Sequence, residues 1–195
     1  MRYLVSAPPN PGPHPLLCFL HGYDEAAPEP REIALRRHGP LRAGNPKRIQ
    51  DEFVILAPQL PRAGDDWHRF GADVAELVRR VAEEHPIDAR RMYLTGFSFG
   101  GDGVFDLAEG AHPWAGLWAV DPTRVPSHAI EVPVWLSVGE AARRRKPDFI
   151  RTLGLVPAPS GKRVYTDTGD DHVGSARRAY CDLAPYEWLL RQRMP

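Results

Sequence analysis

Seven short apolar runs, most of them uninterrupted by polar residues, constrain the fold of this chain more than any other feature. Continuous runs of this kind are typical of strands buried on both faces, as in a parallel sheet covered by helices. Between them lie helical patterns, and the clearest is an apolar stripe over 74–82 that Pro86 ends. Further helices are expected from about Gly100 to Ala108 and over 186–193. This order predicts an α/β fold with a mostly parallel sheet flanked by helices, its strands at 2–7, 16–21, 53–57, 92–96, 117–120, 134–138 and 163–166.

Length and composition narrow the class of protein. The 195 residues favour one domain spanning 1–195. Twenty-five basic residues balance 25 acidic ones, which gives no reason to expect a nucleic acid or an anionic membrane as partner. No apolar stretch is long enough to cross a bilayer, and the N-terminus lacks the apolar core of a secretion signal, so we expect a soluble, cytoplasmic protein. Scattered histidines, only two cysteines and the lack of a phosphate-binding loop predict neither a metal nor a cofactor.

The turn at 96–101 carries the strongest chemical signal. Gly96, Ser98 and Gly100 fit the G-x-S-x-G pattern, with an apolar strand before it and a helix after it. This context predicts a nucleophilic serine on a sharp strand-to-helix turn, with glycines where strand and helix approach closely. The backbone N–H of Phe99 is then one donor to a developing oxyanion.

Two further elements complete this chemistry at the same edge of the sheet. The strand at 16–21 ends in His-Gly, so we expect the second oxyanion donor to be the N–H of Tyr23, with Gly22 as the next choice. His172 follows the last predicted strand within a Gly-Asp-Asp-His turn, where the general base belongs in this order of residues.

The acid that would orient His172 is less well marked. Glu140 directly follows the strand at 134–138 and is the first choice, since it is the only carboxylate close to that strand end. Asp121, at the end of the neighbouring strand, is the alternative, and a pair without an acid is a third possibility. Two segments, 24–49 and 140–162, have no clear periodicity; both follow predicted strands on the side where such sheets bind ligands.

These residues together resemble a known family. The segments 53–61 and 92–107, with Trp67, His38-Gly39-Pro40 and the closing 186–190, are similar to the phospholipase/carboxylesterase and dienelactone-hydrolase-like α/β-hydrolases, closest to the branch called predicted peptidases. The resemblance implies an eight-stranded three-layer α/β-hydrolase sheet or a trimmed version of it. It also implies a Ser-acid-His triad carried by Ser98 and His172, and hydrolysis of modest esters. Family members have an H-G-x-x-D turn where this chain has Val138 and Ala142 in place of the histidine and aspartate, so the usual acid is absent.

The sequence therefore predicts a serine esterase for small or short-chain acyl esters, compact and without a large lid domain. A non-catalytic binding protein of the same fold, or a peptidase or acyltransferase using the same site, are the alternatives. Trp67 and Phe97 are the candidates for lining the substrate pocket. The basic run 143–146 is expected to be a solvated loop rather than an anion site. Oligomeric state is left open.

Overall fold

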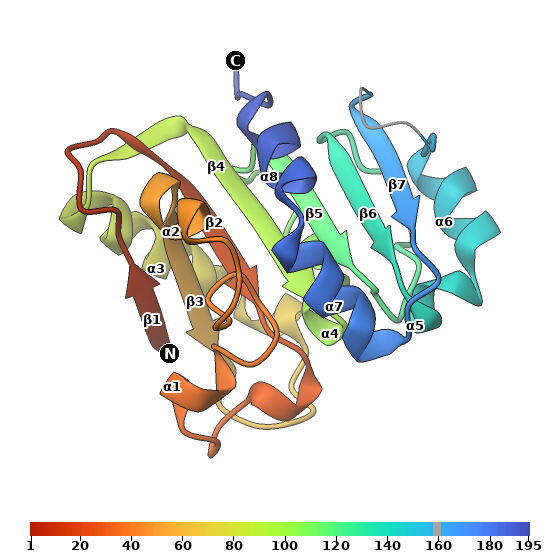
Figure 1. Ribbon diagram of the computed structural model, residues 1–195, viewed down its shortest axis with the longest axis horizontal. Coiled ribbons are helices and arrows are strands. Elements are labelled where there is room, and N and C mark those ends of the chain that lie inside the picture. The colour runs from red at the N-terminus through yellow and green to blue at the C-terminus, as the bar shows by residue number, and fades with distance from the viewer. Residues whose placement is uncertain (158–160) are drawn as a thin grey trace.

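A computed structural model describes residues 1–157 and 161–195. Within them, strands form one seven-stranded sheet with the order β1-β3-β2-β4-β5-β6-β7 (Figure 1). Only β1 runs antiparallel, against β3, and the remaining neighbours pair in parallel. The strands are β1 Arg2–Ser6, β2 His14–Leu20, β3 Val54–Gln59, β4 Ile87–Phe97, β5 Gly116–Val120, β6 Val134–Val138 and β7 Arg163–Asp167. All seven predicted runs are therefore strands, and the mostly parallel sheet is confirmed.

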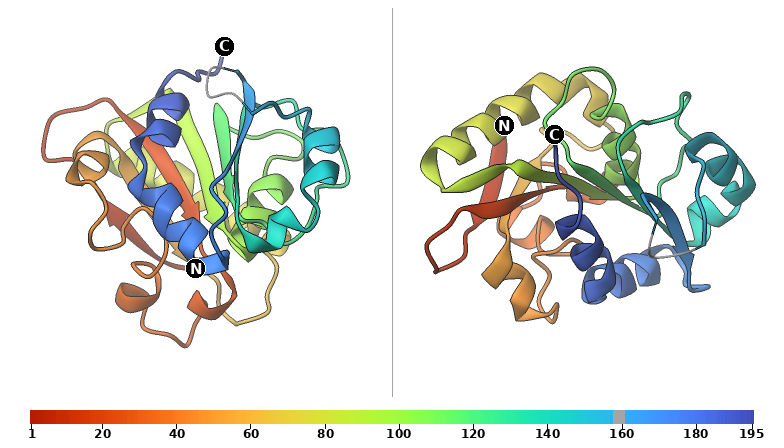
Figure 2. Two further views of the ribbon diagram at one scale, coloured as in Figure 1. Left: turned by 45° about the vertical axis from the view of Figure 1, so that its right-hand side comes forward. Right: turned by 90° about the horizontal axis from the view of Figure 1, so that it is seen from above.

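Helices cover both faces of this sheet (Figure 2). One layer packs side chains of α3, α4, α5 and α6 against the sheet, among them Val78, Phe105 and Phe149. The opposite layer holds α2, α7 and α8, with Ile49, Tyr180 and Trp188 in its core. The helix bounds are α1 Arg31–Ala34, α2 Lys47–Glu52, α3 Gly71–Glu84, α4 Phe99–Asp106, α5 Glu140–Arg143, α6 Lys146–Leu153, α7 His172–Cys181 and α8 Leu183–Leu190, with 3-10 turns η1 Tyr23–Glu25 and η2 Trp67–Phe70.

The main departure from the predicted elements is α7. His172 was expected in a flexible turn, but it is the first residue of a ten-residue helix. Asp171 caps this helix, since its side chain accepts a 2.6 Å hydrogen bond from Gly174 N–H. Its buried side includes Ser175, Ala176 and Ala179, too small to form a strong apolar stripe in the sequence. Among the described residues, the unassigned segment 24–49 contains α1 and the start of α2, and the segment 140–162 contains α5 and α6.

The parallel strands leave their carboxyl ends at one edge of the sheet. Chain segments that follow β2, β4, β5, β6 and β7 therefore meet there. Among the described residues no helix is long and apolar enough to cross a membrane.

Candidate active site

Ser98 stands on a strained turn between β4 and α4. Its backbone has φ 57° and ψ −120°, a conformation that a residue with a side chain rarely adopts. Its N–H donates a 3.0 Å hydrogen bond to Val120 O on β5, which fixes the turn to the neighbouring strand. The flanking glycines allow the close approach, since a Cβ on Gly100 would lie 1.9 Å from the carbonyl oxygen of Leu20. A Cβ on Gly96 would likewise lie 2.2 Å from Gly100 O.

The structure brings His172 to this serine. Its Nε2 lies 2.9 Å from Ser98 Oγ, and its Nδ1 lies 2.5 Å from Asp121 Oδ2. The three side chains form a continuous line of hydrogen bonds from a fully buried carboxylate to a nearly buried hydroxyl. With Nδ1–H donating to Asp121, Nε2 carries the lone pair that faces Ser98 Oγ, which is the tautomer a general base requires.

Asp121, the second choice from the sequence, holds the position expected of Glu140. Glu140 is exposed at the start of α5 and pairs with Arg144 one helical turn later, at 2.9 Å. Within the described residues it makes no hydrogen bond to His172, so its selection as the partner of His172 is corrected. The physical reason is the path of α7, which packs on β5 and β6 and whose first residue, His172, reaches Asp121 at the end of β5.

The turn after β6 still contributes to the arrangement, through its backbone. The N–H groups of Gly139 and Ala142 donate to Asp121 Oδ1 at 3.0 and 2.8 Å, and that of Ala141 to Oδ2 at 3.2 Å. Three amide donors fix the plane of the Asp121 carboxylate. These contacts of 139–142 could not be predicted from the sequence, because backbone donors leave no signature in side-chain identity.

The backbone of Asp121 itself is unusual, with φ 42°. Aspartate tolerates this left-handed conformation better than most residues, because its short side chain can hydrogen-bond locally. Asp102 on α4 holds the segment that follows, since it accepts hydrogen bonds from the N–H groups of Thr123 and Arg124 at 2.8 and 2.9 Å. The sequence signal for Asp121 was its position directly after the buried strand β5.

Tyr23 and Phe99, the expected oxyanion donors, lie side by side. Their rings are 5.4 Å apart between centroids, and Phe99 begins α4 whereas Tyr23 begins η1. The first N–H groups of a helix have no partner within it, so both amides are available to a ligand. The preceding Gly22 is close to Ser98, since a Cβ placed there would lie 3.5 Å from Ser98 Cβ. The Gly22 N–H, which was the next choice as oxyanion donor, already donates to Glu25 Oε2 at 2.6 Å.

His21, buried behind this turn, is a structural residue. Its Nδ1–H donates to Gly22 O at 2.6 Å, and its Nε2 accepts from Leu60 N–H at 2.9 Å. Burial lowers the pKa of His21 to about 4, so the ring is neutral and this tautomer is fixed at neutral pH. The Trp67 indole donates to His21 O at 3.1 Å and packs edge-on against its ring.

The expected pocket residues are placed differently from the prediction. Trp67 is only 1% exposed and belongs to the core beneath the His-Gly turn, so it does not line an open pocket. Phe97 is also buried, but its ring lies 4.7 Å from that of His172 and 5.2 Å from that of His38. Phe97 therefore packs against the imidazole ring of His172. Burial and the nearby Arg37 lower the pKa of His38 to about 4.

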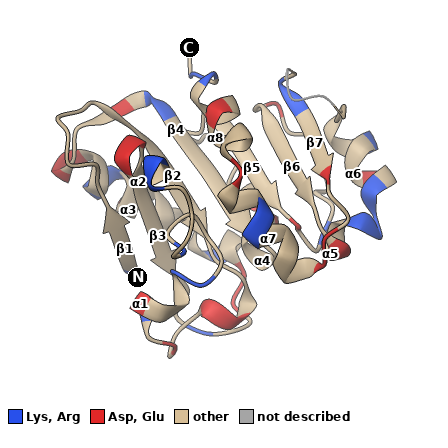
Figure 3. Cartoon of the chain, viewed as in Figure 1, with Lys and Arg blue, Asp and Glu red and all other residues tan. Residues whose placement is uncertain are grey.

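Each residue of the basic run 143–146 pairs with an acidic side chain, and Figure 3 shows where the basic and acidic residues lie along the chain. Arg143 and Lys146 both contact Asp167, while Arg144 and Arg145 pair with Glu140 and Asp148. The run was expected to be a loop, but it spans the end of α5 and the start of α6, and each of its four cations pairs with a carboxylate.

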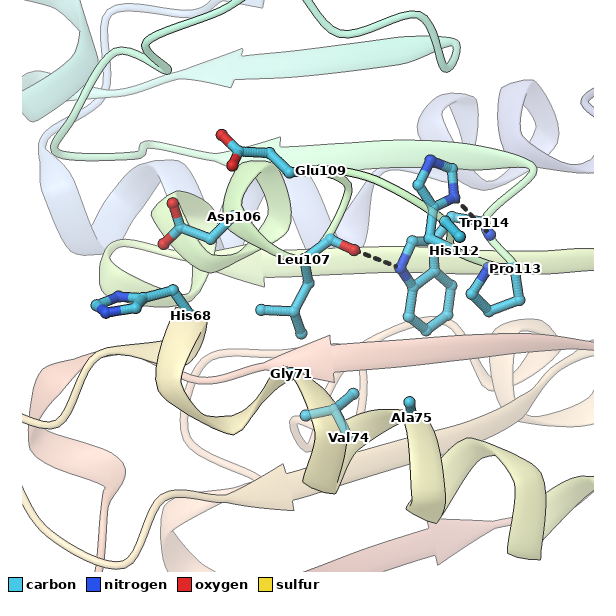
Figure 4. A pocket seen from close by; sticks show the side chains of 11 residues that line it. His68, Gly71, Val74, Ala75, Asp106, Leu107, Glu109, His112, Pro113 and Trp114 are labelled. Atoms are coloured by element: carbon cyan, nitrogen blue, oxygen red, sulfur yellow. Dashed lines mark hydrogen bonds between the residues drawn. The ribbon is translucent and has the colours of Figure 1, made fainter.

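A cavity of about 200 Å³ lies apart from this site, between α3 and the end of α4 (Figure 4). Leu107 and Trp114 line it, and the Trp114 indole donates to Leu107 O at 3.1 Å. Ser98 precedes the opposite end of α4, so this cavity is separate from the Ser98–His172 pair. Among the described residues no cluster of three or more His, Cys, Asp or Glu could hold a metal ion.

Comparison with known proteins bears on the fold of this chain. No family model matches the chain. A bifunctional acetylxylan esterase/xylanase of Neocallimastix patriciarum is 31% identical over 102 residues, which is 50% of this chain and 14% of that protein. A thermostable esterase of known structure superposes with a TM-score of 0.78 and 22% identity, over 98% of this chain and 59% of that one.

A second solved structure, of a protein named as a dienelactone hydrolase from Klebsiella pneumoniae, gives a TM-score of 0.69 and 15% identity, over 97% of this chain and 92% of that one. Both neighbours share the helix-flanked, mostly parallel sheet, and the resemblance inferred from the sequence points to the same proteins. The seven-stranded sheet and these superpositions identify the chain as a protein of the α/β-hydrolase fold.

Proposed function

We propose that this chain is a serine esterase for small or short-chain acyl esters, with Ser98 as nucleophile, His172 as general base and Asp121 as the acid that orients the base. The observation that carries the proposal is the continuous line of hydrogen bonds from Asp121 through His172 to Ser98. The same constellation recurs on unrelated folds, and it is recognised by geometry and not by sequence position.

In the proposed reaction, His172 Nε2 removes the proton of Ser98 Oγ while the oxygen attacks the ester carbonyl. The negative charge that develops on the carbonyl oxygen is held by the N–H groups of Phe99 and Tyr23. The imidazolium of His172 is stabilised by the buried Asp121, and it then protonates the leaving alcohol. A water molecule, activated by the same histidine, releases the acyl group from Ser98.

Two observations favour a small acyl group. The exposed ring of Tyr23 lies 5.4 Å from that of Phe99, the partly exposed residue after Ser98, so bulky aromatic groups stand close to the serine turn. The name of the curated relative, an acetylxylan esterase/xylanase, includes action on an acetyl ester. The expected partner is therefore a small-molecule ester, and the reaction requires no cofactor.

Covalent labelling tests the proposal directly. A fluorophosphonate probe is expected to label the wild-type chain, and Ser98→Ala is expected to abolish the labelling. Turnover of p-nitrophenyl esters, from acetyl to octanoyl, should be highest for the shortest chains and should vanish in the same variant. Labelling that is equal in wild type and Ser98→Ala would refute Ser98 as the nucleophile.

The competing functions give other outcomes in the same assays. A non-catalytic binding protein would show neither labelling nor turnover. A peptidase would cleave peptidyl p-nitroanilides in addition to esters, whereas an esterase would leave the anilides intact. An acyltransferase would pass the acyl group to an added alcohol in preference to water.

A further inference from the structure

Glu25 is a buried carboxylate that the proposed reaction does not use. It is 1% exposed, and burial raises its pKa to about 7. Its Oε2 accepts the 2.6 Å hydrogen bond from Gly22 N–H, whereas its Oε1 is buried and has no hydrogen-bond partner among the described residues. Burying a carboxyl group that makes only one hydrogen bond costs free energy of folding. Proteins typically retain such unfavourable groups at functional sites.

The segment that carries Glu25 is held firmly. Gln59 on β3 donates from Nε2 to both Glu25 O and Glu29 O at 2.9 Å. On the other side of the turn, His21 holds Gly22 O, as described above. Gly22, the one residue between His21 and Tyr23, is therefore held at its N–H by Glu25 and at its carbonyl oxygen by His21.

The geometry of Gly22 connects these hydrogen bonds to the nucleophile. Its backbone is extended, with φ −79° and ψ −170°, so its N–H and that of Tyr23 point to different sides of the chain. Glu25 takes the first of these N–H groups. The second, on Tyr23, is left for a ligand next to Ser98, since Gly22 itself lies against that serine.

We infer that Glu25 is a positioning residue for the oxyanion hole: by holding Gly22 N–H it fixes the orientation of the turn, and so presents Tyr23 N–H to the oxyanion formed at Ser98. This inference rests on the proposed esterase function and adds a residue that does not touch the substrate. Its effect must appear in the transition state, because only there does the carbonyl oxygen carry the charge that Tyr23 would bind.

Three variants test this inference. Glu25→Met keeps the volume but removes the acceptor, Glu25→Gln keeps an acceptor oxygen, and Glu29→Ala is the control. Glu29 lies on the same segment, and its carboxylate pairs with Arg37 without contacting Gly22. Thermal melts establish that each variant folds, and Glu25→Ala replaces Glu25→Met if the latter does not.

The measurements are kcat and KM for p-nitrophenyl acetate and the inhibition constant of a trifluoromethyl ketone, whose adduct with a serine carries an oxyanion. For Glu25→Met we expect kcat to fall about 10- to 100-fold, somewhat less than the loss caused by removing an oxyanion donor outright. The affinity for the ketone should fall by the same factor, with KM nearly unchanged. Glu25→Gln should retain most of the activity, and Glu29→Ala should match wild type.

The inference is overturned if Glu25→Met keeps its kcat, if KM rises while the affinity for the ketone does not change, or if Glu25→Gln is as impaired as Glu25→Met. A wild-type chain that neither hydrolyses esters nor reacts with a fluorophosphonate would instead refute the proposed function, and this inference with it. Activity in wild type together with full activity in Glu25→Met would refute the inference alone.

Discussion

Replacing Asp121 by asparagine is the most informative single perturbation of this site. Asp121 Oδ1 accepts N–H bonds from Gly139 and Ala142, while Oδ2 faces His172 Nδ1 and Ala141 N–H. In Asp121→Asn the amide oxygen must take the Oδ1 position, because the NH₂ group cannot face two backbone donors at 3.0 Å or less. The NH₂ group is then directed at His172.

The consequence for His172 follows from its two nitrogens. Its Nδ1 must become the acceptor, so the proton moves to Nε2 and points at Ser98 Oγ, and the lone pair that would take the serine proton is lost. The loss of an equivalent acid elsewhere lowers kcat about 10⁴-fold, which corresponds to about 5.5 kcal/mol of transition-state stabilisation. We expect a loss of this order in kcat for p-nitrophenyl acetate, with the fold retained.

Glu140→Gln is the matched control. Its carboxylate is half exposed and paired with an exposed arginine, so its removal should change stability by no more than about 0.5 kcal/mol and should leave kcat unaltered. Retention of more than about a tenth of wild-type kcat in Asp121→Asn, against the 10⁴-fold loss expected for a triad acid, would refute the reasoning. An equal loss in both variants would refute it as well.

The remaining predictions concern the framework of the site. The pKa of Glu25 is raised from 4.5 to about 7, so the stability this group contributes is fully present below about pH 4.5 and is lost as pH rises through about 7. Glu25→Gln has no such loss, and urea unfolding should show its stability relative to wild type increasing by about 3 kcal/mol between acidic and alkaline pH; a pH-independent difference would contradict the buried, titrating carboxyl. Gly100→Ala should destabilise the fold by about 3 kcal/mol or more, because its Cβ would meet Leu20 O at 1.9 Å. Gly71→Ala, with open space around its Cβ, should melt at or above the wild-type temperature, and equal melting of the two alanine variants would be the contrary result. Trp67→Phe removes the hydrogen bond to His21 O and should lower the free energy of unfolding, measured by chemical denaturation, by about 1 kcal/mol. The same variant should change KM little.

Several parts of this protein could be predicted from local pattern alone. Strands β2 to β6 follow from contiguous apolar runs, because a strand buried on both faces needs no alternation to be recognised, whereas the edge strands β1 and β7 are partly exposed. The turn at Ser98 is equally local, since Gly96 and Gly100 are required by atoms only a few residues away in the chain or on the adjoining strand. His172 could be selected by order alone, as the histidine after the last strand.

Tertiary structure decided which carboxylate meets that histidine. Asp121 and Glu140 both follow neighbouring parallel strands, whose ends are only about 4.8 Å apart, so the sequence could not separate them. Which carboxylate meets His172 depends on α7, because His172 is the first residue of this helix and lies at the end of β5. The weak apolar pattern of α7 did not predict a helix there. A hydrogen bond is made or lost within about half an ångström, and that precision comes from how helices pack on the sheet. The sequence alone therefore determined the sheet, the turn at Ser98 and the choice of His172. Packing alone placed Asp121 beside that histidine, supplied the amides that hold its carboxylate and buried Glu25 next to Gly22.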